Sequence, residues 1–155
     1  MNSKHKRKGN RSLAPRCPYC GSITVLRSAD GIYQDNSGHA MLYVCKNYPR
    51  CDSYVRVKPG SSIPMGTPAN KELRVLRTKA HYYFDQMHTL GIMSKREAYQ
   101  WLADLFCCPL SEAHIGMMGE YYCQQVINES KKVLEAYHRK CASSQKKKEE
   151  EVRAS

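Results

Sequence analysis

Cys17-Pro-Tyr-Cys20 and, after 24 intervening residues, Cys45-Lys-Asn-Tyr-Pro-Arg-Cys51 are two cysteine-bounded segments with the composition of tight, metal-binding turns. Such a turn aims two thiolates at one point, and Gly21 suits the positive φ that the first turn needs. Structural zinc takes four ligands at the corners of a tetrahedron, and two turns supply two ligands each. The alternatives are four free thiols, two disulfides, or His39 in place of one cysteine. The pairing predicts one structural zinc ion, held by Cys17, Cys20, Cys45 and Cys51.

Short β-type runs surround these cysteines. Residues 23–26, 41–44 and 54–57 are rich in apolar and β-branched side chains, and Asp30-Gly31 and Asn36-Ser-Gly38 are turn signals between the first two runs. We predict a zinc ribbon of three or four antiparallel strands over residues 15–58. An ordered unit of roughly 40 residues builds too small a core to fold alone, so the ribbon is expected to be unfolded without its metal.

The pattern becomes helical after the ribbon. Residues 59–66 are predicted to be a linker, and apolar residues then recur at helical spacing through a unit assigned to residues 67–141. Thr67 and Pro68 have the residue types favoured at an N-cap and the first helical position. Gly91 is a helix stop, and Ser94-Lys-Arg-Glu97 is a capping box that opens a second helix. With a third helix from about residue 117 to about residue 140, the predicted fold class is α+β, a small antiparallel zinc ribbon followed by a three-helix unit.

Charge is distributed unevenly along the chain. The formal net charge is +11, and most of the surplus lies in the N-terminal third, including residues 1–14, which are predicted to be a disordered basic tail. Residues 142–155 are predicted to be a charged tail, helical only by fraying. The sequence has neither a secretory signal pattern nor an apolar run of bilayer length, so we expect a cytoplasmic location in a bacterial or phage-infected cell. In that reducing compartment, the eight cysteines favour metal binding or free thiols over disulfides.

Cations and tyrosines are interleaved through the predicted ribbon. Cations can follow a phosphate backbone while aromatic faces stack on unpaired bases, which is how many single-strand-binding proteins work. We therefore predict a non-enzymatic protein that binds nucleic acid with little sequence preference, and we favour single-stranded DNA. About half of the ribbon tyrosines are expected to pack inside it. The residues predicted to contact nucleic acid are Arg16, Tyr19, Arg27, Lys46, Tyr48, Arg50, Arg56 and Lys58.

Two resemblances add to this interpretation. Cys-Pro-x-Cys-Gly followed by Cys-x-Asn-Tyr-Pro-x-Cys resembles the zinc ribbons at the C-terminal end of bacterial type I DNA topoisomerases, which bind single-stranded DNA. That resemblance covers about residues 15–57 and implies zinc ligation by the four cysteines and a DNA-facing position for Tyr48. The longer arrangement, with Pro64-Met-Gly-Thr-Pro-Ala-Asn-Lys-Glu-Leu-Arg74, Ala80-His81 and His114-Ile-Gly116, resembles a family of small phage and mobile-element zinc-finger-containing proteins over about residues 15–130.

Two other non-enzymatic functions fit the sequence. A helix-turn-helix would place residues 114–120 in a DNA major groove, although this segment is glycine-rich and has no Arg, Lys, Asn or Gln. A phage-borne protein-binding adaptor, or an inhibitor of a host nucleic-acid machine such as a defence nuclease, would instead use exposed apolar side chains on the helices. The candidates for that surface are Met87, Ile92, Met93, Met117 and Met118.

Enzymatic activity is not predicted. The sequence has no phosphate-binding glycine loop, no paired acidic motif and no nucleophile elbow. His81, Asp85 and His88 share one face of a helix and could hold a metal together with His114, but a polar face with a buried, hydrogen-bonded His81 is the simpler interpretation. The remaining cysteines fit no ribbon spacing and are predicted to be buried free thiols: Cys107, Cys108, Cys123 and Cys141.

Overall fold

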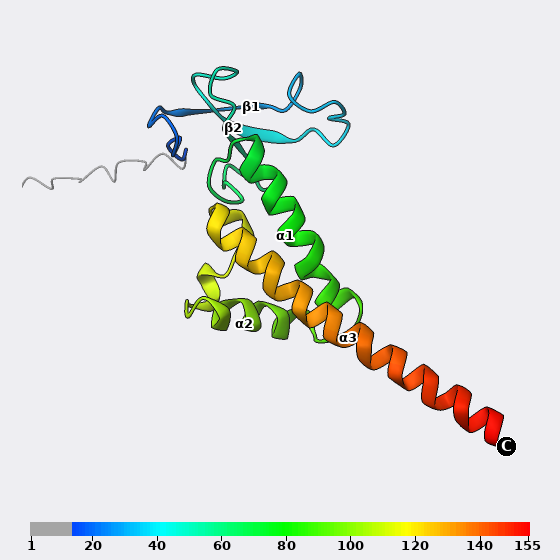
Figure 1. The fold of residues 1–155 in the computed structure, drawn as a ribbon. Helices are drawn as coiled ribbons and strands as arrows, with labels where there is room; N and C mark the ends of the chain where they lie inside the picture. Colours follow the sequence, from blue (N-terminus) through cyan, green and yellow to red (C-terminus); the bar gives the residue numbers. More distant parts are fainter. Residues whose placement is uncertain (1–13) are drawn as a thin grey trace, which may run out of the picture. The chain divides into compact units, whose positions relative to one another are not determined.

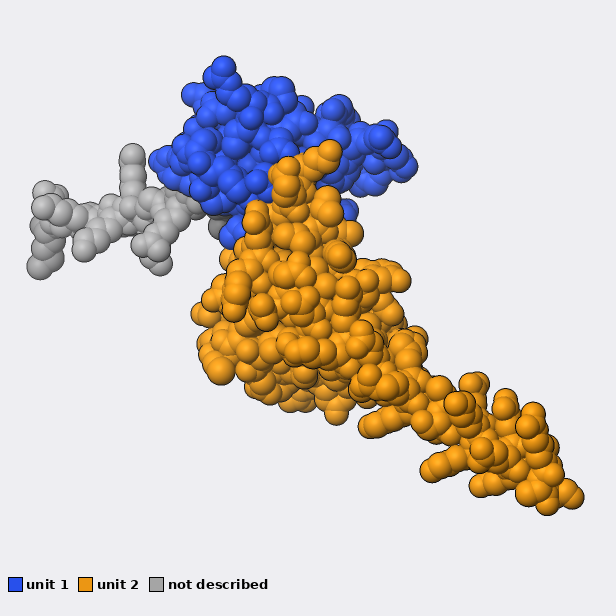
Figure 2. All heavy atoms as spheres, in the orientation of Figure 1, with its two compact units in different colours: residues 1–70 blue, residues 71–155 orange. Residues whose placement is uncertain are grey.

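A computed structural model of the protein describes residues 14–155, so the predicted basic tail lies outside the described residues except for Ala14. The chain divides into two compact units, residues 1–70 and residues 71–155, which Figure 2 shows in blue and orange. The described part of unit 1 contains the strands, and unit 2 contains the helices (Figure 1). The predicted α+β fold class is therefore confirmed.

Unit 1 is built on a three-stranded antiparallel sheet with the order β1-β2-β3. The strands are β1 (Thr24–Ser28), β2 (Met41–Cys45) and β3 (Tyr54–Arg56), close to the three predicted runs. The connection between β1 and β2 is organised by Asn36, whose Oδ1 accepts from the Ala40 backbone N–H at 2.7 Å and whose Nδ2 donates to Asp30 Oδ1 at 2.7 Å. Such Asx contacts fix a turn without any apolar core.

Both faces of this small sheet carry buried side chains. Residues directly opposite one another in an antiparallel ladder share a face, and side chains alternate between faces along a strand. One face buries Leu42 and Val44 with Ala29 and Ala40, and the other buries Tyr43, Val55 and Val57. The two clusters are thin, as expected for a unit of this size.

The segment for which a linker is predicted belongs to unit 1. After β3 the chain turns and returns antiparallel to it: Met65 N–H donates to the Arg56 carbonyl at 2.8 Å, and Ala69 and Tyr54 exchange backbone hydrogen bonds of 3.0 and 3.2 Å. Pro68 and Ala69 are buried there, and the first helix begins only at Lys71. The expectation that Thr67 and Pro68 open this helix is wrong, because backbone pairing with β3 takes these residues despite their local preference.

Unit 2 contains α1 (Lys71–Thr89), α2 (Lys95–Leu105) and α3 (Glu120–Ala154), with two 3₁₀ turns, η1 (Leu110–Glu112) and η2 (Ile115–Met117), between α2 and α3. Helices α1 and α3 pack side by side (Figure 1). Gly91 follows α1 with φ 72°, and the capping box at Ser94 is present, which confirms both helix signals. The fully buried side chains of this unit include Phe84, Met87, Leu102, Val126 and Ile127.

Helix α3 is longer than predicted, since it continues through the charged C-terminal residues to Ala154. Residues 138–155 are all exposed, and the end of the helix projects beyond α1 and α2 within unit 2 (Figure 1). The prediction of a merely frayed tail is wrong because extending an existing helix by Ala, Lys and Glu requires no new nucleation. In the described part of the chain, no helix has the length and apolar character needed to cross a membrane.

Candidate metal centre and nucleic-acid surface

Two tight turns of unit 1 present the four predicted zinc ligands. In the first, the Cys17 carbonyl accepts from Gly21 N–H at 2.9 Å, and Gly21 has φ 71°, the left-handed conformation that glycine adopts most easily. In the second, the Cys45 carbonyl accepts from Tyr48 N–H at 2.9 Å, and Asn47 accepts from Cys51 N–H at 3.0 Å. The Tyr48–Pro49 peptide bond is cis.

The four cysteine sulfurs converge on one point. Their Sγ atoms all lie within 4.8 Å of one another, with 3.6 Å between Cys17 and Cys51 and 3.4 Å between Cys20 and Cys45. A tetrahedral zinc with Zn–S bonds of about 2.3 Å separates its sulfurs by about 3.8 Å, so the cluster needs little adjustment to fit the ion. No other cluster of three or more potential metal ligands occurs within residues 14–155. The protein therefore binds one structural zinc ion at this centre.

The surroundings of the sulfurs differ from ligand to ligand. Hydrogen bonding by Ser22 lowers the pKa of the exposed Cys20 thiol to about 6, whereas burial raises the pKa of Cys45 to about 12 and also raises that of Cys51. Asn47 Nδ2 supports the exposed side by donating to Cys20 Sγ at 3.5 Å and to Ser22 Oγ at 2.9 Å. Zinc has to displace protons from the buried thiols, so its binding is coupled to proton release.

All six cations predicted to contact nucleic acid are exposed. Arg27 on β1 and Arg56 on β3 both pair with Leu42 on β2, so they project from the same face of the sheet on either side of a buried residue. Within the described part of the chain, none of the six forms an ion pair. The only hydrogen bond that one of their cationic groups makes is from Arg16 Nη1 to the Gly21 carbonyl, at 3.1 Å.

Two of the three acidic side chains of the ribbon, Asp30 and Asp35, are engaged in their own turns. Asp30 accepts from Asn36 Nδ2, and this hydrogen bond lowers the pKa of the Asp30 carboxyl. Asp35 accepts from the Ser37 backbone N–H, which lowers its pKa in the same way. Both of these carboxylates are therefore held within their own turns.

More of the ribbon tyrosines are buried or half-buried than the half expected from the sequence. Tyr43 is buried, and its hydroxyl donates to the Ser62 carbonyl at 2.7 Å. Tyr48, predicted to face DNA, is half-buried and packs against the Leu42–Val44 cluster, as do Tyr33 and Tyr54. Tyr19 is 44% exposed, and only its hydroxyl is held, as the acceptor of the Asn70 N–H at 3.1 Å. Tyr19 is therefore the ribbon tyrosine best placed to stack on a base.

Sequence reasoning missed several apolar side chains on the ribbon surface. Strand β1 is an edge strand, and its Val25 and Leu26 are exposed, as are Ile23 before it and Met41 on β2. Their β-type pattern is the same in a buried strand as in an exposed one, so only the observed register separates them from core residues.

The other predicted sites are not assembled. His81 is exposed, which contradicts the expectation that it is buried, and His88 only approaches Asp85, with 3.6 Å between Nε2 and Oδ1. Of the cysteines in unit 2, Cys123 is buried and Cys108 is half-buried, but Cys107 and Cys141 are exposed, so the prediction of four buried thiols is wrong for these two.

A four-cysteine centre on a three-stranded antiparallel sheet defines a zinc-ribbon protein, here with a separate helical unit. The chain belongs to a family described as a zinc-finger-containing domain, which it matches over residues 13–133. That match covers the described part of unit 1 and ends inside α3. Neither a curated protein nor a solved structure matches the chain.

Proposed function

We propose that the ribbon binds single-stranded nucleic acid, DNA in the first instance, with little sequence preference and without catalysing a reaction. The observation that carries this proposal is the set of six exposed cations with no ion pair among the described residues. Cations that are not neutralised within the protein can replace the counterions of a phosphate backbone, and this exchange is the main source of sequence-tolerant affinity.

The arrangement of Arg27 and Arg56 favours an extended strand as the ligand. They lie two strands apart on one face of the sheet, which corresponds to roughly 10 Å between their backbone positions. Two long side chains at this spacing can contact different phosphates of one strand. Lys46 and Arg50, which lie in the second metal-binding turn, are further exposed cations of the ribbon.

Tyr19 supplies the stacking element of the proposal. Its ring is exposed beside the Cys20 ligand, and its hydroxyl is held by the Asn70 N–H, which limits the freedom of the ring before any ligand arrives. A stacked base contributes about 1–3 kcal/mol. Tyr48 has one face against the core, so it can offer at most its other face.

The test is fluorescence anisotropy of the zinc-loaded protein with labelled single-stranded DNA, duplex DNA and single-stranded RNA over a series of salt concentrations. Single strands have a log–log salt slope of about −0.7 per phosphate contact, so the double change Arg27→Gln and Arg56→Gln is expected to make the slope less negative by about 1.4. Tyr19→Ala is expected to weaken binding about tenfold, whereas Tyr19→Phe keeps the ring and most of the affinity.

The matched control for the arginine pair is the double change Arg139→Gln and Lys140→Gln, which removes two exposed cations from α3. Equal losses from the two pairs would mean that net charge alone drives binding. Absence of binding to every probe at low salt would overturn the proposal.

The structure weakens the alternative of a helix-turn-helix. Residues 114–120 include η2 and extended backbone rather than a recognition helix, and Ile115 and Met118 are buried. The surface available for the alternative protein-binding role is also smaller than the sequence suggests, because Met87 is 0% exposed and belongs to the helical core. Met117 is the clearly exposed methionine of the predicted adaptor surface, with 54% of its surface accessible.

A further inference from the structure

Unit 2 contains an acidic stretch within a strongly basic protein. Residues 97–130 include five Asp or Glu residues and no Lys or Arg, although the whole chain has a net charge of +11. Arg77 of α1 does reach this stretch, but its Nε and Nη2 both donate to the Met118 carbonyl, at 3.0 and 2.9 Å. The stretch itself is therefore acidic, and its charge opposes the binding of a polyanion.

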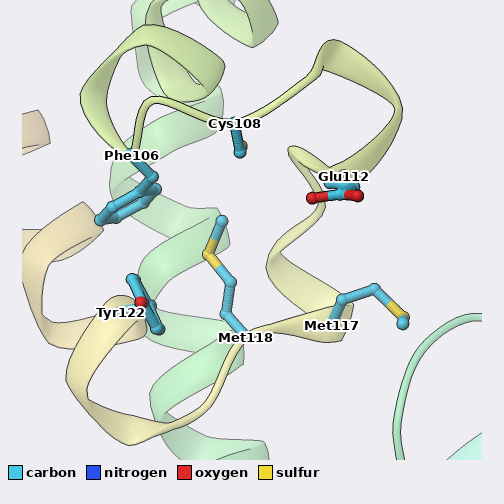
Figure 3. A pocket seen from close by; sticks show the side chains of 6 residues that line it. All are labelled: Phe106, Cys108, Glu112, Met117, Met118 and Tyr122. Atoms are coloured by element: carbon cyan, nitrogen blue, oxygen red, sulfur yellow. The ribbon is translucent and has the colours of Figure 1, made fainter.

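The same stretch carries a pocket of about 240 Å³ between the end of α2 and the start of α3. Figure 3 shows the rings of Phe106 and Tyr122 on one side of it and Glu112 and Met117 on the other, with Met118 between them. The two rings meet edge to face, with their centroids 5.0 Å apart. The Met118 side chain lines the pocket and is almost completely buried, so the pocket borders the core of unit 2.

Two exposed side chains, Met117 and Tyr122, line the pocket, and other exposed apolar side chains lie near them in the sequence. Leu110, Met117, Tyr121 and Tyr122 are all substantially exposed, and they come from η1, η2 and the first turn of α3. A concentration of exposed apolar surface with a polar rim is typical of a protein-interaction site. The Glu112 carboxylate at the rim forms no ion pair among the described residues.

We propose that this pocket binds an aromatic side chain of a partner protein, presented by a segment that carries Lys or Arg next to the aromatic residue. Rings and thioether sulfurs in the walls make favourable contacts with an inserted ring. A free carboxylate at the rim and the acidic stretch around it select flanking cations. The proposal concerns unit 2 alone and does not rest on the nucleic-acid proposal.

The size of the pocket supports a single side chain as the occupant. Sites for cofactors and drug-sized ligands usually have volumes of about 300–1,000 Å³, so this pocket is small for them. Interfaces between proteins, by contrast, are often dominated by one or two aromatic residues that enter such a pocket, with weaker contacts around them.

The experiment follows the methyl groups of the seven methionines by NMR in the full-length, zinc-loaded protein. The probe is a short blocked peptide of lysines around a central tryptophan. Ring-current shifts are expected at Met117 and Met118, which line the pocket, but not at Met41 and Met65, which lie in unit 1. A peptide with alanine at the centre, and one with glutamates in place of the lysines, are expected to leave the Met117 signal unchanged.

Two variants with matched controls assign the binding to the pocket. Met117→Lys and Glu112→Lys are each expected to weaken binding of the tryptophan peptide by about fivefold or more. The controls are Met65→Lys, at a methionine of similar exposure (56% against 54%), and Glu150→Lys in the exposed end of α3, and both are expected to leave binding unchanged.

Three results would overturn the proposal. One is a Met117 signal that does not respond to the tryptophan peptide, and another is an equal response to the glutamate peptide. The third is a Met117 signal that changes with protein concentration when no peptide is present, because a second copy of the chain would then occupy the pocket.

Discussion

The ribbon unit and the helical unit bury different kinds of side chain. The fully buried side chains of unit 1 include Leu42 and Val44 together with two of the zinc ligands, Cys17 and Cys45. Those of unit 2 include Phe84 and Met87 of α1 and Ile127 of α3, and these two helices pack against each other. Part of the interior of unit 1 is therefore a coordination site, whereas unit 2 has an ordinary apolar core.

This difference affects where each unit can place function. Because a metal ion replaces apolar volume, the ribbon can leave most of its side chains at the surface, and Arg27 and Arg56 lie directly beside the core residue Leu42. In unit 2, the pocket proposed to bind a partner lies where regular helix gives way to η1 and η2, between the end of α2 and the start of α3.

Removal of zinc is expected to have the largest effect and to act on one unit only. Structural zinc contributes about 10–16 kcal/mol in comparable small modules, far more than the remaining clusters of unit 1 can replace. A chelator should therefore unfold the ribbon, with fast hydrogen exchange across β2 and β3. The fluorescence of Trp101, the single tryptophan of the chain and a residue of α2, should stay unchanged.

Cysteine variants sharpen this prediction. Cys17→Ser is expected to abolish stoichiometric zinc binding, while Cys141→Ser, at an exposed cysteine of α3, is expected to leave one zinc ion per chain. A metal-sensitive dye that reports released zinc measures both. Retention of β2 protection after complete zinc loss would contradict the view that the metal forms part of the core of unit 1.

Phe84→Ala is expected to have the next largest effect, and on the other unit. The Phe84 ring is fully buried, lies edge to face with Tyr99 at 5.2 Å between centroids, and stacks on Trp101 at 6.4 Å. Loss of such a ring costs about 3–5 kcal/mol, a large part of the stability of a typical domain. Urea unfolding followed by Trp101 fluorescence should show the loss, and zinc stoichiometry should be unchanged.

The parts of the fold that could be predicted depend on local signals. The cysteine spacings, the alternation in the three strands, Gly91 and the capping box each act within a few residues, and the structure contains all of them. The four cysteines could be assigned because metal geometry imposes a spacing that the sequence displays directly.

The parts that could not be predicted depend on contacts between distant residues. Tyr54 pairs with Ala69, so a segment with good helix-start residues runs beside β3 instead. Whether Tyr48 faces solvent depends on the apolar cluster formed by Ala29, Ala40, Leu42 and Val44, and whether Met87 is free depends on the packing of α1 in unit 2. The pocket beside Met118 arises from irregular backbone that has no periodic pattern in the sequence.

The smallest effect is expected at the capping box of α2, where local hydrogen bonds rather than burial stabilise unit 2. Ser94 Oγ accepts from Glu97 N–H at 3.1 Å, and Ser94→Ala should lower the free energy of unfolding of unit 2 by about 1 kcal/mol, whereas Ser143→Ala in the exposed end of α3 should not.

The Ser94 backbone N–H donates to Glu97, which lowers the pKa of that carboxyl from 4.5 in the folded state. A lowered folded pKa stabilises the fold above pH 4.5, and this contribution is lost as the pH falls through the folded value. The stability difference between the native protein and Glu97→Gln, measured by urea unfolding with Trp101 fluorescence, should therefore shrink on acidification below pH 4.5. A difference that stays constant across this range would mean that the charge of Glu97 has no part in the cap.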